Sequence, residues 1–438
     1  MRSERFTKYG MLATAALLVA AACSGTGATP IPAATAKPPT AVPPTAAPPT
    51  AAPTPTPAPA TPTMAAATAT PAASAPATMS APSGTPAADL TPAPSDLSSL
   101  VTAAKAEGSL NVIALPRDWC NYGTLIDGFK TKYGLTVNEI NPGGGSGDEL
   151  QAIITNQSNP GPQAPDVIDV GVAFGPQAMQ QNLIAPYKVS TWDTIAEADK
   201  DPNGYWYGDY YGVLSFEVNT DVAKATPADW PDLLGSDYKN SVALAGDPTV
   251  SNQAIQSVFA AALANGGSLD NAQPGLDYFK KLDDAGNFVP TIANTGTIAS
   301  GETPVVITWS YLALADADTL AGNPNVAVVI PASGRFGGLY AQAISAYAPH
   351  PNAAKLWEEY LYSDEGQLGW LNGYCYTSRY DDLVSRNAIP SDLASKLPDV
   401  TGAVFPSDAQ LTAAKALITD GWKSQIGVQV GPSPTPAP

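Results

Sequence analysis

The stretch NGYWYGDYYGVLSFEVNTD, residues 203–221, joins a group of aromatic residues to a strand-like pattern. In its second part, VLSFEVN (213–219), the apolar residues Leu214, Phe216 and Val218 stand two positions apart. Side chains two apart in a β-strand share one face, so this face is expected to lie in the core. A slip of one residue would expose the whole apolar face, and a single pairing register is therefore expected.

The first part of the stretch, YWYGDYY (205–211), is expected to be a loop that precedes the strand. It contains five aromatic rings and one acid, and Gly208 and Gly212 favour turns. Rings in such a loop can line a binding site or seal the edge of a sheet. We expect both uses, with ligand contacts drawn from Trp206, Asp209, Tyr210 and Tyr211.

Short apolar runs alternate with helical patterns on both sides of this stretch. The runs predict strands at 110–115, 135–140, 165–171, 242–246, 305–309 and 326–330. The helical patterns lie at 124–134, 148–157, 252–264 and 274–284. This alternation predicts an α/β fold of two units joined end to end, with parallel sheet covered by helices on both faces.

The N-terminal part of the chain has the pattern of an exported protein. Residues 1–22 begin with a basic segment and continue with a short apolar run, which predicts a signal peptide. Cys23 follows small residues, as in the cleavage box of bacterial lipoproteins, so we expect lipid attachment there. Residues 23–95 are rich in Pro, Ala and Thr and are expected to form an extended tether, and 431–438 a disordered tail.

The net charge and the few cysteines and histidines argue against several kinds of partner and site. The chain has 21 Lys and Arg against 39 Asp and Glu, a net charge of −18, which disfavours nucleic acid as a partner. With Cys23 lipidated, Cys120 and Cys375 remain, and both a disulfide between them and two separate thiols stay open. The sequence has a single histidine, His350, so neither a histidine-based metal site nor a Ser/His/Asp triad is expected.

Two segments resemble the bacterial extracellular solute-binding proteins of ABC transporters. YGVLSFEVNTD (211–221) is similar to the family's crossover strand between two lobes, and residues 338–374 are similar to its return strand and the helices that follow. A recurring pattern of the family is matched at Ala353, Ala354, Lys355, Trp357, Leu361, Ser363, Glu365, Gly366 and Gln367. The resemblance looks closest to the branch that handles iron, polyamines, thiamine and phosphonates.

The resemblance implies a type II periplasmic-binding-protein fold, a two-lobe clamp that closes on a small molecule and delivers it to an ABC-type permease in the membrane. We expect lobe 1 at 96–212, lobe 2 with the crossover strand at 213–335, and a return to lobe 1 with C-terminal helices at 336–430. The protein is expected to be monomeric, to lack a cofactor, to catalyse no reaction, and to be lipid-anchored outside the cytoplasm, at the cell surface or in the periplasm.

Two other functions stay open. A ligand-sensing protein that serves a receptor would share the fold. An extracellular hydrolase would need a pair of carboxylates, for which Asp118, Asp209 and Asp247 are available, although no GxSxG motif occurs.

Ligands of open α/β sheets bind beyond the carboxyl ends of the strands, and the segments there carry the other candidate residues. Ser146, in a glycine-rich loop, and Ser251 are equally well explained as helix caps. The candidates from these segments are Arg117, Asp118, Trp119, Tyr122, Ser146, Phe174, Asp247, Ser251, Trp309 and Tyr311.

The class of ligand is narrowed by the residues after the predicted strand at 305–309. In polyamine-binding relatives an aspartate grips an ammonium two residues after a tryptophan, and Tyr311 stands at that place here. Iron-binding relatives present two neighbouring tyrosines, whereas only Tyr311 is present at this point, which disfavours ferric iron. We therefore expect a small organic molecule held by stacking or cation–π contacts, with no bound metal.

Overall fold

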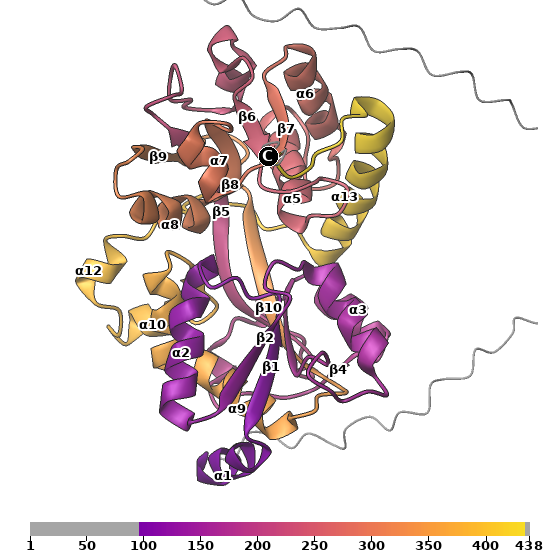
Figure 1. The fold of residues 1–438 in the computed structure, drawn as a ribbon, viewed down its shortest axis with the longest axis vertical. Helices are drawn as coiled ribbons and strands as arrows, with labels where there is room; N and C mark the ends of the chain where they lie inside the picture. The colour runs from indigo at the N-terminus through magenta and orange to yellow at the C-terminus, as the bar shows by residue number, and fades with distance from the viewer. Residues whose placement is uncertain (1–95, 434–438) are drawn as a thin grey trace, which may run out of the picture. The chain divides into compact units, whose positions relative to one another are not determined.

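The computed structural model describes residues 96–433 (Figure 1). The expected signal peptide, the lipid attachment at Cys23 and the tether lie outside the described residues, as does most of the expected tail. None of the helices within 96–433 is long and apolar enough to cross a bilayer.

A mixed sheet of nine strands runs through the described chain, and a separate pair of parallel strands flanks it. The order along the sheet is β3, β10, β5, β8, β6, β7, with β4 paired to β10 and both β9 and β11 paired to β5. The separate pair is β1 (Ser109–Ile113) and β2 (Thr136–Ile140). The strands of the sheet are β3 (Val167–Gly171), β4 (Ile184–Ala185), β5 (Tyr207–Asn219), β6 (Val242–Leu244), β7 (Phe288–Ile292), β8 (Val305–Trp309), β9 (Val326–Val329), β10 (Gly337–Ser345) and β11 (Tyr376–Thr377).

Strand β5 belongs to both halves of the sheet. Its first part pairs with β10 and β11, and its second part pairs with β8 and β9. We call lobe 1 the part that contains β1 to β3 and the start of β5, and lobe 2 the part that contains β6 to β8 and the end of β5. In Figure 1, β5 and β10 run side by side from one lobe into the other. The expected two-lobe α/β clamp with crossover strands is confirmed.

The expected loop at 205–211 is wrong, because β5 already begins at Tyr207. The backbone of its first part is paired with β10, which follows more than a hundred residues later in the chain. A paired backbone satisfies its N–H and C=O groups, and this outweighs the local preference of Gly208 and Gly212 for turns. The expected parallel pairing is found within each lobe, between β1 and β2 and between β6 and both β7 and β8. β5 leaves lobe 1 and β10 returns to it, so these two strands are antiparallel.

The helices lie where the helical patterns predict them, with shifts of one or two residues. These helices are α2 (Tyr122–Tyr133), α3 (Ser146–Asn156), α5 (Asn252–Ala264) and α6 (Gln273–Asp284). The remaining α-helices are α1 (Ser98–Glu107), α4 (Phe174–Gln180), α7 (Thr295–Ser300), α8 (Ser310–Leu320), α9 (Pro351–Leu361), α10 (Asp364–Asn372), α11 (Tyr380–Ser385), α12 (Ser391–Ala394) and α13 (Asp408–Gly421). The last of these, α13, packs against α5 and α6 of lobe 2.

The apolar face of β5 is buried as expected. Leu214, Phe216 and Val218 are at most 1% exposed. The opposite face is buried as well, because α8 packs against β5. Glu217 on that face lies beside Asp316 of α8, and its burial raises its pKa to about 9. Glu217 therefore keeps its proton at neutral pH.

A disulfide joins Cys120 to Cys375 and ties the segment after β1 to the segment after α10. The two cysteines are 255 positions apart in the sequence. A cross-link that closes so long a loop restricts the unfolded chain strongly.

We expect the Cys120→Ser variant to unfold more easily than the oxidised wild type, by about 2–5 kcal/mol in the free energy of unfolding. Urea unfolding followed by circular dichroism measures the difference. Wild type treated with a reductant should match the variant, and the Cys120→Ser, Cys375→Ser double variant should lose no more than the single one. Equal unfolding midpoints for oxidised and reduced wild type would contradict this expectation.

Candidate functional site

Five aromatic rings from both lobes meet where β5 passes between them. They are Trp119, Tyr210, Trp309, Tyr311 and Tyr340, which we call the aromatic cluster. Tyr210 and Tyr340 are stacked with ring centroids 5.2 Å apart, and Trp309 and Tyr311 are stacked at 6.2 Å. Trp119 meets the edges of Tyr311 and Tyr340 at 5.6 and 5.7 Å. Lobe 1 supplies Trp119 and lobe 2 supplies Trp309 and Tyr311, so the cluster closes the space between the lobes.

Two glycines make room for this cluster. Gly212 of β5 and Gly338 of β10 are cross-strand partners and share one face of the sheet. A Cβ atom on Gly212 would come within 2.5 Å of the Tyr311 ring, and one on Gly338 would overlap the indole of Trp309. The absence of two side chains therefore lets the stacked rings lie flat against the strands, and Gly212 serves close approach rather than a turn.

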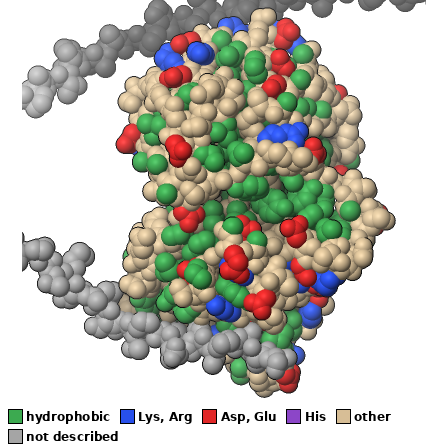
Figure 2. Space-filling view, turned by 180° about the vertical axis from the view of Figure 1, so that it is seen from behind, with side chains coloured by type: hydrophobic (Ala, Val, Ile, Leu, Met, Phe, Trp, Pro, Cys, Tyr) green, Lys and Arg blue, Asp and Glu red, His purple; other side chains and the backbone are tan. Residues whose placement is uncertain are grey.

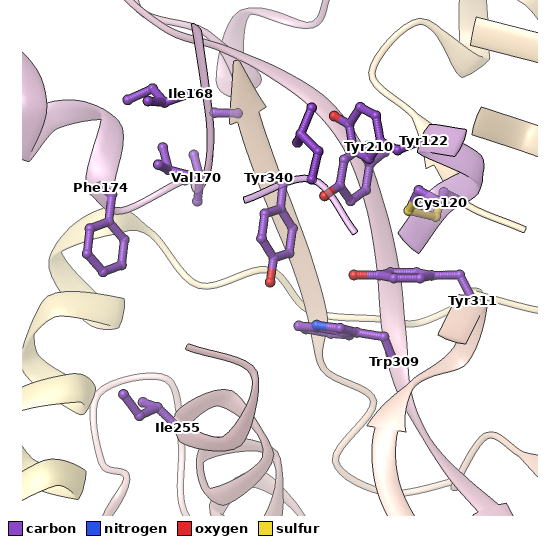
Figure 3. Packing of buried hydrophobic residues seen from close by; sticks show 14 of the residues in the cluster. Cys120, Tyr122, Ile168, Val170, Phe174, Tyr210, Ile255, Trp309, Tyr311 and Tyr340 are labelled. Atoms are coloured by element: carbon purple, nitrogen blue, oxygen red, sulfur yellow. A yellow bond between two sulfur atoms is a disulfide. The ribbon is translucent and has the colours of Figure 1, made fainter. Parts of the chain in front are cut away.

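The cluster and its neighbours carry hydrogen-bond donors that have no partner within the described chain. The unpaired buried atoms are Trp119 Nε1, Asn252 Nδ2, Trp309 Nε1, Ser310 Oγ and Tyr311 Oη. Figure 3 shows the hydroxyls of Tyr311 and Tyr340 and the indole nitrogen of Trp309 directed toward one another. Buried polar groups are nearly always paired, and an unpaired one costs about 1–3 kcal/mol. All five groups can donate, so an acceptor-rich group would satisfy them, while the nearby acceptors Asp169 Oδ1, Gln256 Oε1 and Gln342 Oε1, also unpaired, would take a donor.

Two helices begin beside these donors. Ser310 is the first residue of α8, and Asn252 is the first residue of α5. The N-terminal end of a helix carries a partial positive charge and free N–H groups, which favour an anionic group nearby. The positive ends of both helices and the unpaired donors therefore favour the same kind of ligand group.

A pair of buried acids, Asp169 and Asp209, lies next to the cluster in lobe 1. Tyr210 Oη donates to Asp169 Oδ2 at 3.0 Å, and Gln342 Nε2 donates to Asp209 Oδ2 at 3.0 Å. Burial raises the pKa of Asp169 to about 6. Burial and the neighbouring charge of Asp169 raise the pKa of Asp209 well above its usual value. The pair therefore holds at least one proton near neutral pH.

The expected ligand residues Tyr122 and Asp209 belong to this buried network. Tyr122 is 0% exposed, and its Oη accepts a hydrogen bond from Gln342 Nε2 at 2.9 Å. Asp209 is also 0% exposed. The structure thus places both beside the cluster within lobe 1 and away from solvent.

Arg117 and Asp118 are exposed. The Arg117 guanidinium donates to Glu139 Oε1 at 2.9 Å and to Asp127 Oδ2 at 2.5 Å, which links the segment after β1 to β2 and α2. Trp119 lies two residues later, at the start of a short 3₁₀ helix (Trp119–Asn121) that also contains the disulfide-bonded Cys120. The disulfide and the Arg117 ion pairs together fix the loop that presents Trp119.

Three other candidates are occupied by local hydrogen bonds. Ser146 Oγ accepts from the backbone N–H of Gly171 at 3.0 Å. Ser251 Oγ accepts from the N–H of Ala254 at 3.4 Å and caps α5, and Asp247 Oδ1 accepts from the N–H of Thr249 at 2.8 Å in the preceding turn. The hydrogen bonds that these three residues make at the end of β3 and the start of α5 explain their positions.

The remaining candidates, Phe174, Trp206 and Tyr211, line two cavities outside the cluster. Trp206 and Tyr211 line a cavity of about 590 Å³. Phe174 lines another of about 440 Å³, where the Lys415 Nζ lies 4.0 Å from the centroid of its ring. Of the expected ligand residues, the structure therefore brings together Trp119, Tyr210, Trp309 and Tyr311.

Sequence reasoning missed Tyr340, Asn252, Ser310 and Gln256. Tyr340 lies in the strand GGLYAQAIS, where an aromatic residue two positions after paired glycines was the available signal. Asn252 and Gln256 lie in the first turns of α5, and nothing in the sequence separates them from other polar residues of a helix.

Side chains of the two lobes touch at several points around the cluster. Tyr374 of lobe 1 donates to Asp318 of α8, and Lys415 of α13 lies over Phe174 of α4. Trp309 and Tyr311 are 0% and 1% exposed. In the space-filling view, a hollow separates the two halves of the described chain, with hydrophobic side chains beside it (Figure 2). These contacts and the burial of Trp309 and Tyr311 show that the lobes are closed over the cluster in this structure.

The part of the chain from 96 to 433 has no group of three or more His, Cys, Asp or Glu residues placed to hold a metal ion. Burial raises the pKa values of Tyr210 and Tyr311, which disfavours the phenolates that ferric iron requires. His350 lies in lobe 1, where its Nδ1 is 2.8 Å from Asp166 Oδ2 and its Nε2 is 2.8 Å from Ser109 Oγ.

Comparison with known proteins finds one matching family and a similar binding protein. A family model described as bacterial extracellular solute-binding protein matches residues 163–397. The putative 2-aminoethylphosphonate-binding periplasmic protein of Salmonella typhimurium is 29% identical over 255 residues, which cover 56% of this chain and 70% of that protein.

Solved structures share the fold. The periplasmic binding protein P5PA matches with a TM-score of 0.57 and 22% identity, over 73% of this chain and 99% of that one. The periplasmic binding protein AfuA from Actinobacillus pleuropneumoniae, solved with exogenous fructose-6-phosphate bound, matches with a TM-score of 0.56 and 22% identity, over 73% and 98%.

The acid pair beside the cluster makes stability depend on pH. Because the pKa of Asp169 rises from about 3.9 in the unfolded chain to about 6, the protonated pair stabilises the fold below the unfolded value. This contribution is lost as the pH rises through about 6. We expect a higher thermal unfolding midpoint at pH 5 than at pH 7.5, and a smaller difference for Asp169→Asn.

The matched control is Asp237→Asn, which changes an exposed aspartate of lobe 2 and should keep the full pH dependence. Differential scanning calorimetry at both pH values gives the midpoints. A pH dependence that is identical in Asp169→Asn and wild type would show that the pair does not hold the proton.

Proposed function

The chain belongs to the bacterial extracellular solute-binding protein family, and we propose that it binds a small organic molecule at the aromatic cluster and delivers it to an ABC-type permease. Its relatives and structural neighbours are binding proteins, and we propose that this chain likewise catalyses no reaction. The acids available to a hydrolase lie on three different elements, and Asp209 among them is fully buried.

The proposal is carried by one observation: five buried donors from both lobes, in or beside the aromatic cluster, have no partner in the described chain. Trp119 comes from lobe 1, and Asn252, Trp309, Ser310 and Tyr311 come from lobe 2. A solute with several acceptor oxygens would pair with donors of both lobes only when the lobes are closed. Such a solute has a differential affinity for the closed state, which is what drives closure of a clamp.

The charged groups around the cluster further restrict the kind of solute that could bind there. Within residues 96–433, none of the contacts between a lysine and an aromatic ring involves a ring of the cluster. An anionic group would therefore be held by neutral donors and helix ends. The faces of the tyrosines and the Asp169–Asp209 pair would accommodate a cationic group on the same molecule.

An aminophosphonate fits these requirements. The Salmonella typhimurium relative is described as a putative 2-aminoethylphosphonate-binding protein. The phosphonate oxygens of this compound would take the unpaired donors, and its ammonium would face the rings and the acid pair. We propose 2-aminoethylphosphonate or a close analogue as the solute.

The unpaired donors give a test that separates binding from folding. Tyr311→Phe and Trp309→Phe each remove one donor and keep an apolar ring, so the ligand-free protein should be as stable as wild type or more stable. Binding of 2-aminoethylphosphonate should weaken by about 1–2 kcal/mol, roughly 5- to 30-fold in Kd. Isothermal titration calorimetry gives the affinity, and thermal unfolding gives the stability.

Tyr205→Phe is the control, since Tyr205 lies in the same aromatic stretch outside the cluster and should bind normally. Ethylphosphonate and ethanolamine separate the contributions of the two charged groups of the solute. Small-angle scattering should show a smaller radius of gyration when solute is bound. Wild-type affinity in both cluster variants, or an unchanged scattering profile at saturation, would overturn the proposed site and clamp.

We also propose that the protein is anchored to the cell membrane by a lipid on Cys23, with residues 23–95 as a tether. Cys23→Ser should move the protein from the membrane fraction to the soluble fraction. Mass spectrometry of wild type from its host should give a diacylglycerol-modified N-terminal cysteine, and an unmodified Cys23 in mature protein would refute the anchor.

A further inference from the structure

A second cavity with polar walls lies beside the crossover strands. Tyr210 and Tyr211 are neighbours in β5, so their side chains point to opposite faces of the sheet. Tyr210 belongs to the aromatic cluster, whereas Tyr211 stacks on Tyr376 at 5.4 Å and meets the edge of Phe405 at 5.4 Å. A cavity of about 590 Å³ is lined by Tyr211 and Phe405 from this second face and extends to Gly338 and Gln256, and we call it the hinge cavity.

The walls of the hinge cavity combine aromatic rings with acceptor groups. Its rings and acceptors are those of Trp206, Tyr211, Phe405, Asp199, Asp408 and Gln256, and no lysine or arginine lines it. Within residues 96–433, neither Asp199 nor Asp408 forms an ion pair. The two carboxylates are therefore left without a compensating cation in the described chain.

Gln256 supplies an independent sign of a missing partner. Its side chain is 3% exposed, and its Oε1 atom has no hydrogen-bond donor among the described residues. The Nε2 atom donates to Asn252 Oδ1 at 3.2 Å, and Oε1 lies beside Gly338, another residue of the cavity wall. The unpaired atom at this end of the cavity is an acceptor.

Burial of the Asp199 and Asp408 carboxylates also favours a cation beside them. Desolvation raises the pKa values of both Asp199 and Asp408. Asp408 also lies in the first turn of α13, where the helix dipole favours a negative charge. A cation in the cavity would offset the remaining cost of holding two negative groups in a partly buried space.

We propose that the hinge cavity binds an organic cation, a small alkylammonium whose charged head lies among the three rings and faces the carboxylates. Ammonium groups are attracted to the faces of aromatic rings, and quaternary ammonium compounds are recognised by such ring-lined sites. The volume is in the range of small-molecule sites. This proposal does not depend on the solute assigned to the aromatic cluster.

Occupation of the hinge cavity would involve both lobes. Asp199, Trp206 and Tyr211 come from lobe 1, whereas Gln256 lies on α5 and Asp408 begins α13 of lobe 2. A cation that contacts both walls favours the arrangement of lobes seen in this structure. The hinge cavity is therefore placed to couple cation binding to closure of the clamp.

Choline is a suitable probe, and 3,3-dimethyl-1-butanol is an uncharged analogue of nearly the same shape. We expect saturable choline binding by calorimetry and by a change in tryptophan fluorescence at constant ionic strength. The uncharged analogue should bind at least about tenfold more weakly, because it lacks the charge that the rings and carboxylates attract. Asp199→Asn and Asp408→Asn should each weaken choline binding by about three- to tenfold.

Two controls identify where choline binds. Asp237→Asn removes an exposed charge of lobe 2 outside the cavity and should leave choline binding unchanged. Tyr311→Phe alters the aromatic cluster but no residue of the cavity wall, and it should weaken choline binding less than Asp199→Asn does. Loss of choline binding in Tyr311→Phe with normal binding in Asp199→Asn would place the cation in the cluster and overturn the proposal. Absence of saturable choline binding, or equal affinity for the uncharged analogue, would overturn it as well.

Discussion

The pairing of one strand with both lobes is the constraint on which the rest of the structure depends. β5 has thirteen residues, and their backbone groups pair with β10 and β11 on the lobe 1 side and with β8 and β9 on the lobe 2 side. Because neighbouring side chains in a strand point to opposite faces, this one strand presents Tyr210 to the aromatic cluster and Tyr211 to the hinge cavity. Any rotation of the lobes must twist or bend this strand, so it changes the aromatic cluster and the hinge cavity together.

Buried polar atoms without partners gather around the crossover strands. On the face of Gly212 and Gly338, the missing side chains let rings cover the sheet, and both donors and the acceptors of Gln256 and Gln342 are left unpaired. The hinge cavity adds the carboxylates of Asp199 and Asp408, which form no ion pair within residues 96–433. Unpaired buried groups cost free energy, so other contacts between the lobes must hold this closed arrangement.

Much of this architecture could be predicted from the sequence, because local periodicity determines it. The helix at 252–264 and the strand at 305–309 coincide with α5 and β8. Trp309 and Tyr311 could be placed near the junction of the lobes because they stand at the carboxyl end of a strand of an α/β sheet. The start of β5 was missed because it depends on pairing with β10, which local glycines do not report. Arg117 was assigned to the site although its guanidinium turns to Glu139 of β2, since a strand end does not specify the direction of a long side chain.

Burial changes the protonation of several acids of lobe 1. Burial raises the pKa values of Glu149, Asp169, Asp209 and Glu358, so these groups tend to hold protons rather than repel one another. When the pKa of a group is close to the pH of the solution, a charge brought close to the group changes how far it is protonated. A cationic group that approaches the Asp169–Asp209 pair favours the ionised form, and proton release then accompanies its binding. By the same linkage, a lower pH weakens the binding of a cationic group. Binding of such a group is therefore coupled to the protonation of the Asp169–Asp209 pair.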